Sequence, residues 1–148
     1  MPEKILVGGQ WRETNDVLEV KFPYDGSAAG SVYMASQQDM EDAIVAAQKG
    51  FEITRKLPSH KRSEILENLG RIMRERFDDF VEAMILEGGK TRKVAQGELT
   101  RAMQTIKISA EEARRIGGEV FDIDWTPAGE NRQGFTKRLP IGIILGIT

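Results

Sequence analysis

The chain has 148 residues, of which 40% are hydrophobic and 30% are charged, and its 21 basic and 23 acidic side chains give a net charge of −2. This composition is typical of one globular domain and lacks the positive charge with which proteins bind nucleic acid or anionic membranes. The chain contains no cysteine, which excludes disulfides, thiolate metal sites and a cysteine nucleophile within these residues. It also lacks the long apolar segment of a signal peptide or membrane span, so we expect a cytoplasmic protein without a membrane partner.

The first 35 residues are predicted to form short strands. Gly8-Gly9 separates two strand-like segments and favours a hairpin, because glycine tolerates the positive φ that tight turns need. A second turn is expected at Pro23 to Gly26, between a strand at Val17 to Val20 and one at Ala29 to Ala35. We expect these strands to form a small β-meander.

The next 80 residues predict a layer of four helices. The first begins after Ser36, which has Asp39 in the capping-box position, and continues to about Leu57. Pro58-Ser59 starts the second helix, and a third ends at Gly88-Gly89. The fourth runs from about Thr91 to Arg115, and we expect Gly117-Gly118 to cap it. Its apolar stripe consists of Ala95, Leu99, Ala102, Met103, Ile106, Ala110 and Ala113.

Two apolar segments follow the helices. Residues 119–138 predict a β-hairpin whose apolar side chains have no obvious partner, and exposed strand edges of this kind often pair with another chain. Residues 139–148 contain an almost continuous apolar run, Ile141 to Ile147, which predicts a parallel strand buried on both faces. Such a strand needs neighbours on both sides.

Two motifs resemble functional sites without meeting their requirements. Gly89-Lys90-Thr91 matches the end of a phosphate-binding loop, but Met84 occupies the place of the first glycine and a helix, not a strand, precedes it. His60 is the only histidine, and it has no second ligand or base at a useful spacing. We therefore predict no catalytic residue and no metal site in this chain.

Several segments, in the same order, resemble the N-terminal part of the aldehyde dehydrogenase superfamily, whose members use NAD or NADP. The similar segments are Gly8 to Trp11, Pro23 to Gly26, Ala43 to Phe51, Leu57-Pro58 with Arg62 to Leu66, Glu87 to Thr91, Glu98 with Ala102, Ala113 to Glu119, and Phe135 to Thr148. The sequence departs from the family at Phe22, where asparagine is usual, and at Gly88, where threonine is frequent.

The resemblance implies an α/β fold with defined parts. Residues 1–118 would be the N-terminal part of the cofactor-binding domain, 119–138 the hairpin arm for homo-oligomerisation, and 139–148 the first strand of a Rossmann-like, NAD-binding sheet. Because ligands lie at the carboxyl ends of such strands, Ile147 and Thr148 are the expected cofactor-binding residues.

The family oxidises an aldehyde to a carboxylic acid with NAD or NADP. A cysteine thiolate adds to the aldehyde, hydride passes to the nicotinamide, and a glutamate activates the water that releases the acid. An asparagine and a backbone N–H hold the oxyanion. These residues would all lie beyond Thr148, so the resemblance implies that the chain alone is inactive and needs the remainder of the enzyme. The alternative is a stand-alone, non-catalytic interaction module derived from the same fold.

Overall fold

The computed structural model describes residues 1–147. Its N-terminal residues form two separate hairpins. Strand β1 (Ile5–Val7) pairs with β2 (Gln10–Arg12), and β3 (Val17–Lys21) pairs with β4 (Ala28–Tyr33). The turn between β1 and β2 uses positive φ angles of 58° at Gly8 and 84° at Gly9, as its glycines predict.

The predicted β-meander is wrong, because β2 does not pair with β3. The segment between these strands is bonded to the end of β4 instead. Thr14 Oγ1 donates to the carbonyl of Met34 at 2.8 Å, and the Met34 N–H donates to the carbonyl of Asp16 at 2.9 Å. The two hairpins are linked by a parallel bridge between Glu3 and Val32.

Helix α1 (Gln37–Thr54) begins at the predicted capping box. Ser36 Oγ accepts from the Asp39 N–H at 3.2 Å, and Asp39 Oδ2 accepts from the Ser36 N–H at 3.0 Å. The helix packs on β1, where Val7 is buried and Gly8 passes close to Ala46.

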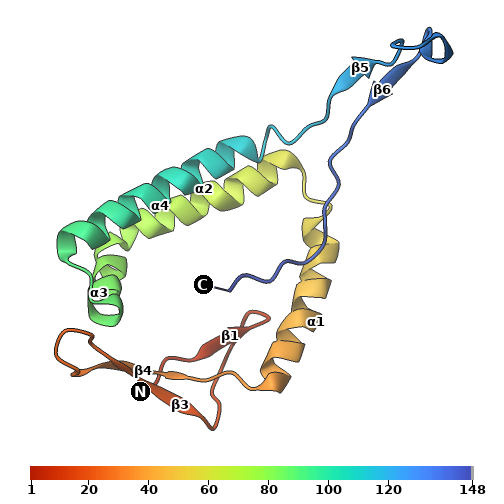
Figure 1. Cartoon of the computed structure of the whole chain (residues 1–148). Coiled ribbons are helices and arrows are strands. Elements are labelled where there is room, and N and C mark those ends of the chain that lie inside the picture. Colours follow the sequence, from red (N-terminus) through yellow and green to blue (C-terminus); the bar gives the residue numbers. More distant parts are fainter. Residues whose placement is uncertain (148) are drawn as a thin grey trace.

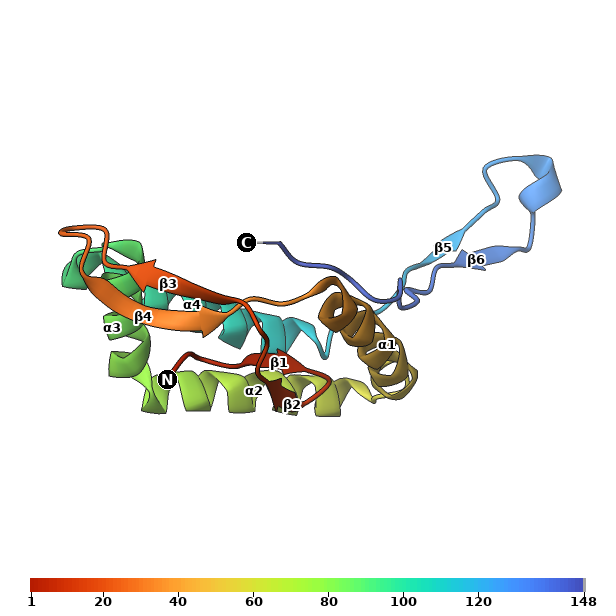
Figure 2. The same ribbon diagram turned by 90° about the horizontal axis from the view of Figure 1, so that it is seen from below.

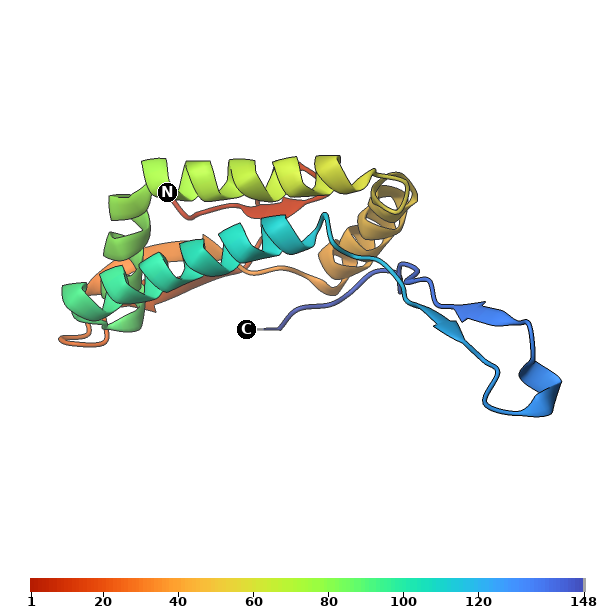
Figure 3. The same cartoon turned by 90° about the horizontal axis from the view of Figure 1, so that it is seen from above.

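Helices α2 (Ser59–Glu75), α3 (Phe77–Gly88) and α4 (Arg92–Glu112) form the packed part of the molecule. α2 and α4 lie side by side and α3 lies across one end of the pair (Figures 1 and 3). The predicted stripe of α4 faces its neighbours: Ala95, Leu99 and Ala110 are buried. The core consists of Val81, Ala95 and Leu99, with Met73, Phe77, Met84 and Ile85 packed around it.

The four-helix layer predicted from the sequence has three members, because α1 packs on β1 apart from α2 and α4 (Figure 2). The helix ends also differ from prediction in one place. Gly89, with φ of 64°, ends α3 as expected, but α4 ends at Glu112, with Ala113 as its C-cap, before the chain reaches Gly117. Gly118 does not cap α4 and lies instead at the base of the following hairpin.

Strands β5 (Val120–Asp122) and β6 (Gln133–Phe135) form the predicted hairpin, which projects from the helices (Figures 1 and 2). Its loop includes a 3₁₀ turn, Pro127–Gly129. Gly118 lies against the returning chain so closely that an added Cβ would stand 1.7 Å from the carbonyl oxygen of Thr136. Only glycine permits this approach.

Residues 139–147 form no strand, so the strand predicted at Ile141 to Ile147 is not present in the described chain. The run returns from the hairpin to the concave side of the arc made by the helices and N-terminal hairpins (Figure 1). Ile141, Ile144 and Leu145 are 90%, 82% and 76% exposed. The physical reason is that strand hydrogen bonds need neighbouring strands, and residues 1–147 place none beside the run.

The exposed area of the molecule, 11979 Å², is far too large for a compact protein of 16.6 kDa. A compact monomer of that mass exposes about 7,600 Å². Much of this additional exposed area belongs to apolar side chains, which are exposed on every helix and in residues 139–147. Helices and hairpins are therefore formed, while much of the surface that they would bury remains open.

Candidate functional site

The sequence predicts two cofactor-binding residues, Ile147 and Thr148. Ile147 is 87% exposed and lies outside any strand. Thr148 lies outside the described residues.

The phosphate-loop look-alike at Gly89 to Thr91 is a structural junction. Gly89 ends α3 in the left-handed conformation and packs against Pro23, where an added Cβ would lie 3.1 Å from the proline Cβ. Lys90 Nζ is bound to the carboxylate of Glu98 on α4, and this bond lowers the pKa of Glu98. Lys90 thus forms an ion pair that links the end of α3 to α4.

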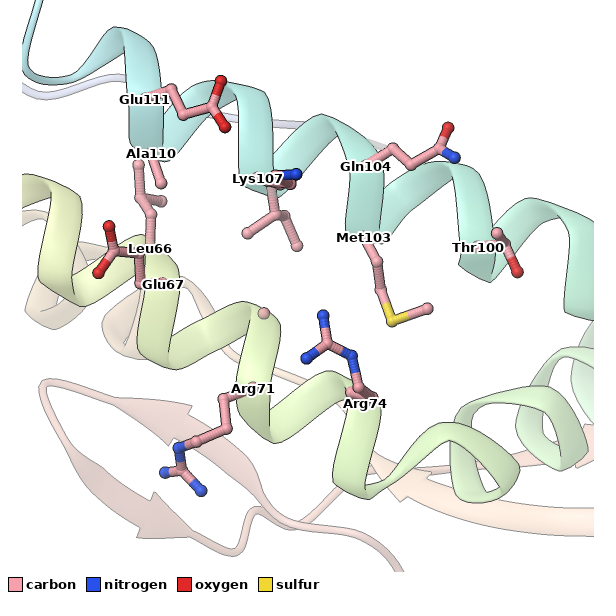
Figure 4. Close-up of a pocket in the computed structure, with 12 residues that line it drawn as sticks. Leu66, Glu67, Arg71, Arg74, Thr100, Met103, Gln104, Lys107, Ala110 and Glu111 are labelled. Atoms are coloured by element: carbon pink, nitrogen blue, oxygen red, sulfur yellow. The ribbon is translucent and has the colours of Figure 1, made fainter.

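A groove of about 430 Å³ lies between α2 and α4 (Figure 4). Its floor is made by Leu66, Gly70, Met103, Ile106 and Ala110. Its rim is polar and charged, with Glu67, Arg71, Arg74, Thr100, Gln104, Lys107 and Glu111.

The groove contains no catalytic arrangement. Arg71 is bonded to Glu75 at 2.6 Å and to Asn68 at 2.8 Å, and Glu67 accepts from Arg114 at 2.7 Å. Figure 4 shows the Arg74 guanidinium beside Met103 in the space between the helices. The sequence analysis did not predict this groove. The feature that could have indicated it is a small residue facing a large one on the adjacent helix, as Gly70 faces Ile106.

A cluster of one arginine and two aspartates joins the first hairpin to α1. Arg12 Nη1 lies 3.2 Å from Asp39 Oδ1 and 2.6 Å from Asp42 Oδ2. Hydrogen bonds from Ser36 and then Arg12 lower the pKa of Asp39, and hydrogen bonds from Arg12 and then Gln38 lower the pKa of Asp42. Each of these groups already has a partner, so the cluster fixes β2 on α1 and carries no chemistry.

Arg62 ties the start of α2 to the end of α4. Its guanidinium donates to the carbonyl of Leu57 at 2.6 Å and to that of Ala113 at 3.5 Å, while its Nε is buried without a partner. Carbonyls at a helix end are left unpaired by the helix itself. Arg62 therefore fixes the point from which the chain leaves α4 toward the hairpin.

Among residues 1–147, no three histidine, cysteine, aspartate or glutamate side chains are grouped to hold a metal ion. The search for a helix able to cross a bilayer likewise finds none in this part of the chain. The described residues therefore provide an architecture with a surface groove and several ion pairs.

Comparison with known proteins assigns that architecture. The model of the aldehyde dehydrogenase family matches residues 11–148. The aldehyde-dehydrogenase-like protein y4uC of Sinorhizobium fredii is 43% identical over 131 residues, which are 88% of this chain and 26% of the relative. The 3-sulfolactaldehyde dehydrogenase of Priestia aryabhattai is 33% identical over 144 residues, which are 97% of this chain and 30% of the relative.

The fold agrees with this match. The crystal structure of the NADP-dependent glyceraldehyde-3-phosphate dehydrogenase from Bacillus halodurans, complexed with NADP, superposes with a TM-score of 0.87 at 30% identity. The match covers 96% of this chain and 30% of that structure. The chain thus spans less than a third of the length of the relatives it matches. Sequence and fold together show that it belongs to the aldehyde dehydrogenase family.

Proposed function

We propose that this chain is the N-terminal segment of an NAD- or NADP-dependent aldehyde dehydrogenase, which oxidises an aldehyde to a carboxylic acid through a cysteine thiohemiacetal. The observation that supports it is the family match over residues 11–148, combined with coverage of only 26% and 30% of two relatives. The catalytic cysteine, glutamate and asparagine would lie beyond residue 148, in a cytoplasmic enzyme.

In this proposal the three parts of the chain have separate roles. Residues 1–118 belong to the cofactor-binding domain, 119–138 form the oligomerisation arm, and 139–148 become the first strand of its sheet. Ile147 and Thr148 would then lie next to the nucleotide, at the carboxyl end of that strand. The described residues supply position and support to the site, and the reacting groups come from the remainder of the enzyme.

The test compares two proteins. The first is the protein encoded by the complete coding region, and the second is the 148-residue chain. With a panel of small aldehydes and NAD or NADP, we expect the first to form NADH or NADPH, measured by absorbance, and the second to form none. A coding region that ends at Thr148, together with a cooperatively unfolding 148-residue chain, would contradict this proposal and support the non-catalytic module.

The arm is the part of the proposal that concerns assembly. Val120, Trp125 and Phe135 are 74%, 83% and 77% exposed, and within residues 1–147 β5 and β6 pair only with each other. A two-stranded ribbon with exposed apolar side chains and free edges favours pairing with a neighbouring subunit.

Light scattering on the full-length protein tests the arm. Phe135→Asp should lower the mass of the assembly, because it places a charge on the apolar hairpin. Thr126→Asp, at a polar position of the same hairpin, should leave the mass unchanged. An unchanged mass of the Phe135→Asp protein would show that the arm is not part of the subunit interface.

A further inference from the structure

The groove between α2 and α4 has the size of a small-molecule site (Figure 4). Its volume of about 430 Å³ lies within the range of about 300 to 1,000 Å³ that is typical of ligand pockets. Along α2 it extends from Leu66 to Arg74, which lie about 12 Å apart along the helix axis. These dimensions suit an elongated small molecule that lies parallel to the two helices.

The floor of the groove is apolar and partly covered. Leu66, Met103 and Ile106 are half-buried, and Ala110 is buried. Gly70 keeps the middle of the floor open, because a side chain there would fill the space in front of Ile106, whose Cγ2 lies 3.5 Å from an added Cβ. A hydrocarbon chain on this floor would remove apolar surface from water, which is favourable.

The opposite character, unpaired positive charge, is found on the rim. The guanidinium of Arg74 lies in the space between the helices beside Met103 (Figure 4). Among residues 1–147, neither Arg74 nor Lys107 on the rim has a salt-bridge partner. By contrast, Arg71 is paired with Glu75 at 2.6 Å and extends away from α4 (Figure 4). A surface arginine without a partner is ordinary, but Arg74 places its charge beside an apolar floor.

The acidic side chains of the rim are already neutralised. Glu67 accepts from Arg114 at 2.7 Å, and Glu111 lies 3.8 Å from the guanidinium of Arg115. These pairs lie toward the start of α2 and the end of α4, away from Arg74. The groove therefore has positive charge to offer at its Arg74 end and apolar surface along the rest of its length.

We propose that this groove binds a small amphipathic carboxylate, with its head on Arg74, Lys107 as a second cation, and its hydrocarbon chain on the floor toward Leu66 and Ala110. The planar guanidinium fork of an arginine matches a carboxylate, with which it can form two parallel hydrogen bonds. The site goes beyond the proposed function, because it uses none of the groups that would oxidise an aldehyde. It adds a second ligand site to the protein.

Photolabelling of the full-length protein locates the site. The probe is octanoate that carries a diazirine near the end of its chain, which attaches to neighbouring side chains on illumination. Digestion and mass spectrometry then identify the labelled peptides. We expect label on the α2 peptide that contains Leu66 and on the α4 peptide that contains Ala110, whatever other part of the protein is labelled. Label on neither peptide would overturn the proposal.

Two matched variants test the role of the charge. Arg74→Gln removes the unpaired guanidinium and should reduce labelling of these two peptides at least about tenfold, because a hydrogen bond to a charged group is lost. Arg71→Gln removes a guanidinium that is paired and extends away from the groove, so labelling should be unchanged. Both positions are exposed, so neither change should disturb folding, which circular dichroism checks. An equal effect of the two variants, or no effect of either, would overturn the proposal.

Competition with unlabelled compounds separates the head from the chain. Octanoate should displace the probe from the two peptides. Octanol, which lacks the charge, and acetate, which lacks the chain, should each be at least about tenfold less effective. Equal competition by octanol would indicate an apolar patch without a carboxylate site, and equal competition by acetate would indicate an anion site that does not use the floor. Either result would overturn the proposal.

The outcome is separable from that of the proposed function, which is judged by formation of NADH or NADPH. An inactive protein that shows the expected labelling would refute only the proposed function. An active enzyme without that labelling would refute only the second ligand site.

Discussion

Helices α2 to α4 form in the described chain, whereas the apolar residues 139–147 do not form the strand that their sequence predicts. Between the ends of each helix, the backbone hydrogen bonds are made within the element, and the side chains of Val81, Ala95 and Leu99 pack together. In residues 139–147, the apolar side chains follow one another almost without interruption, but the backbone bonds of a strand need neighbouring strands, and the described residues place none beside this run. A helix can therefore form before its partner is present, whereas a central strand cannot.

The largest expected effect tests the packed half of this comparison. Leu99→Ala removes a buried side chain from the small core and should lower the free energy of unfolding by about 2 to 5 kcal/mol. Ile144→Ala, in the open half, should change it by less than about 0.5 kcal/mol. Urea unfolding of the 148-residue chain, followed by circular dichroism at 222 nm, measures both. A large cost at Ile144 would show that residues 139–147 are packed after all.

A second effect lies at the junction between the two regions. Gly118→Ala places a Cβ on the carbonyl of Thr136 and should open the base of the hairpin, at a cost of roughly 1 to 3 kcal/mol. Gly117→Ala is the matched control, since its Cβ would meet no atom closer than 3.8 Å. Hydrogen exchange at the Thr136 amide, which donates to Glu119 at 2.9 Å, should accelerate in the first variant only.

A smaller effect tests whether α1, which lies apart from the helical core, depends on its local cap. Ser36→Ala removes the acceptor for the Asp39 N–H and should cost about 1 kcal/mol. Ser59→Ala, at the first residue of α2, removes no capping bond and should be nearly silent. Amide exchange in the first turn of α1 compares the two. Equal exchange would show that packing on β1 holds the helix without the cap.

The smallest effect is electrostatic. Arg12 lowers the pKa of Asp42, so this pair stabilises the contact between β2 and α1 above the ordinary carboxyl pKa of about 4, and the contribution is lost as the pH falls through the lowered pKa. Asp42→Asn should flatten that acid dependence, while the neighbouring Glu41→Gln should not. Urea midpoints measured from pH 6 to pH 3 test this, and a parallel fall in all three proteins would contradict it.

The sequence predicted best the features whose cause is local. The capping box at Ser36, the glycine turn at Gly8-Gly9, the end of α3 at Gly89 and the stripe of α4 are confirmed, because each depends on residues a few positions apart. The sequence-based predictions were wrong where contacts between residues far apart in the sequence determine the structure. The contact of Thr14 with Met34 separates the expected meander into two hairpins, and the packing of α1 on β1 removes that helix from the layer.

The same distinction between local and distant contacts applies to the candidate site. The absence of catalytic residues from these 148 positions, expected from residue types and from the family resemblance, stays a prediction. The groove between α2 and α4 was not predicted, because it arises where Gly70 faces Ile106 across 36 positions of sequence. The cofactor role of Ile147 and Thr148 stays a prediction.

The central claim is that residues 141–147 are a strand whose neighbours lie in the remainder of an aldehyde dehydrogenase. Amide hydrogen exchange of this segment, compared between the 148-residue chain and the protein encoded by the complete coding region, tests it most directly. We expect exchange of these amides in the longer protein to be slower by a factor on the order of 100 or more, as for central strands. Equally fast exchange in both proteins would contradict the claim.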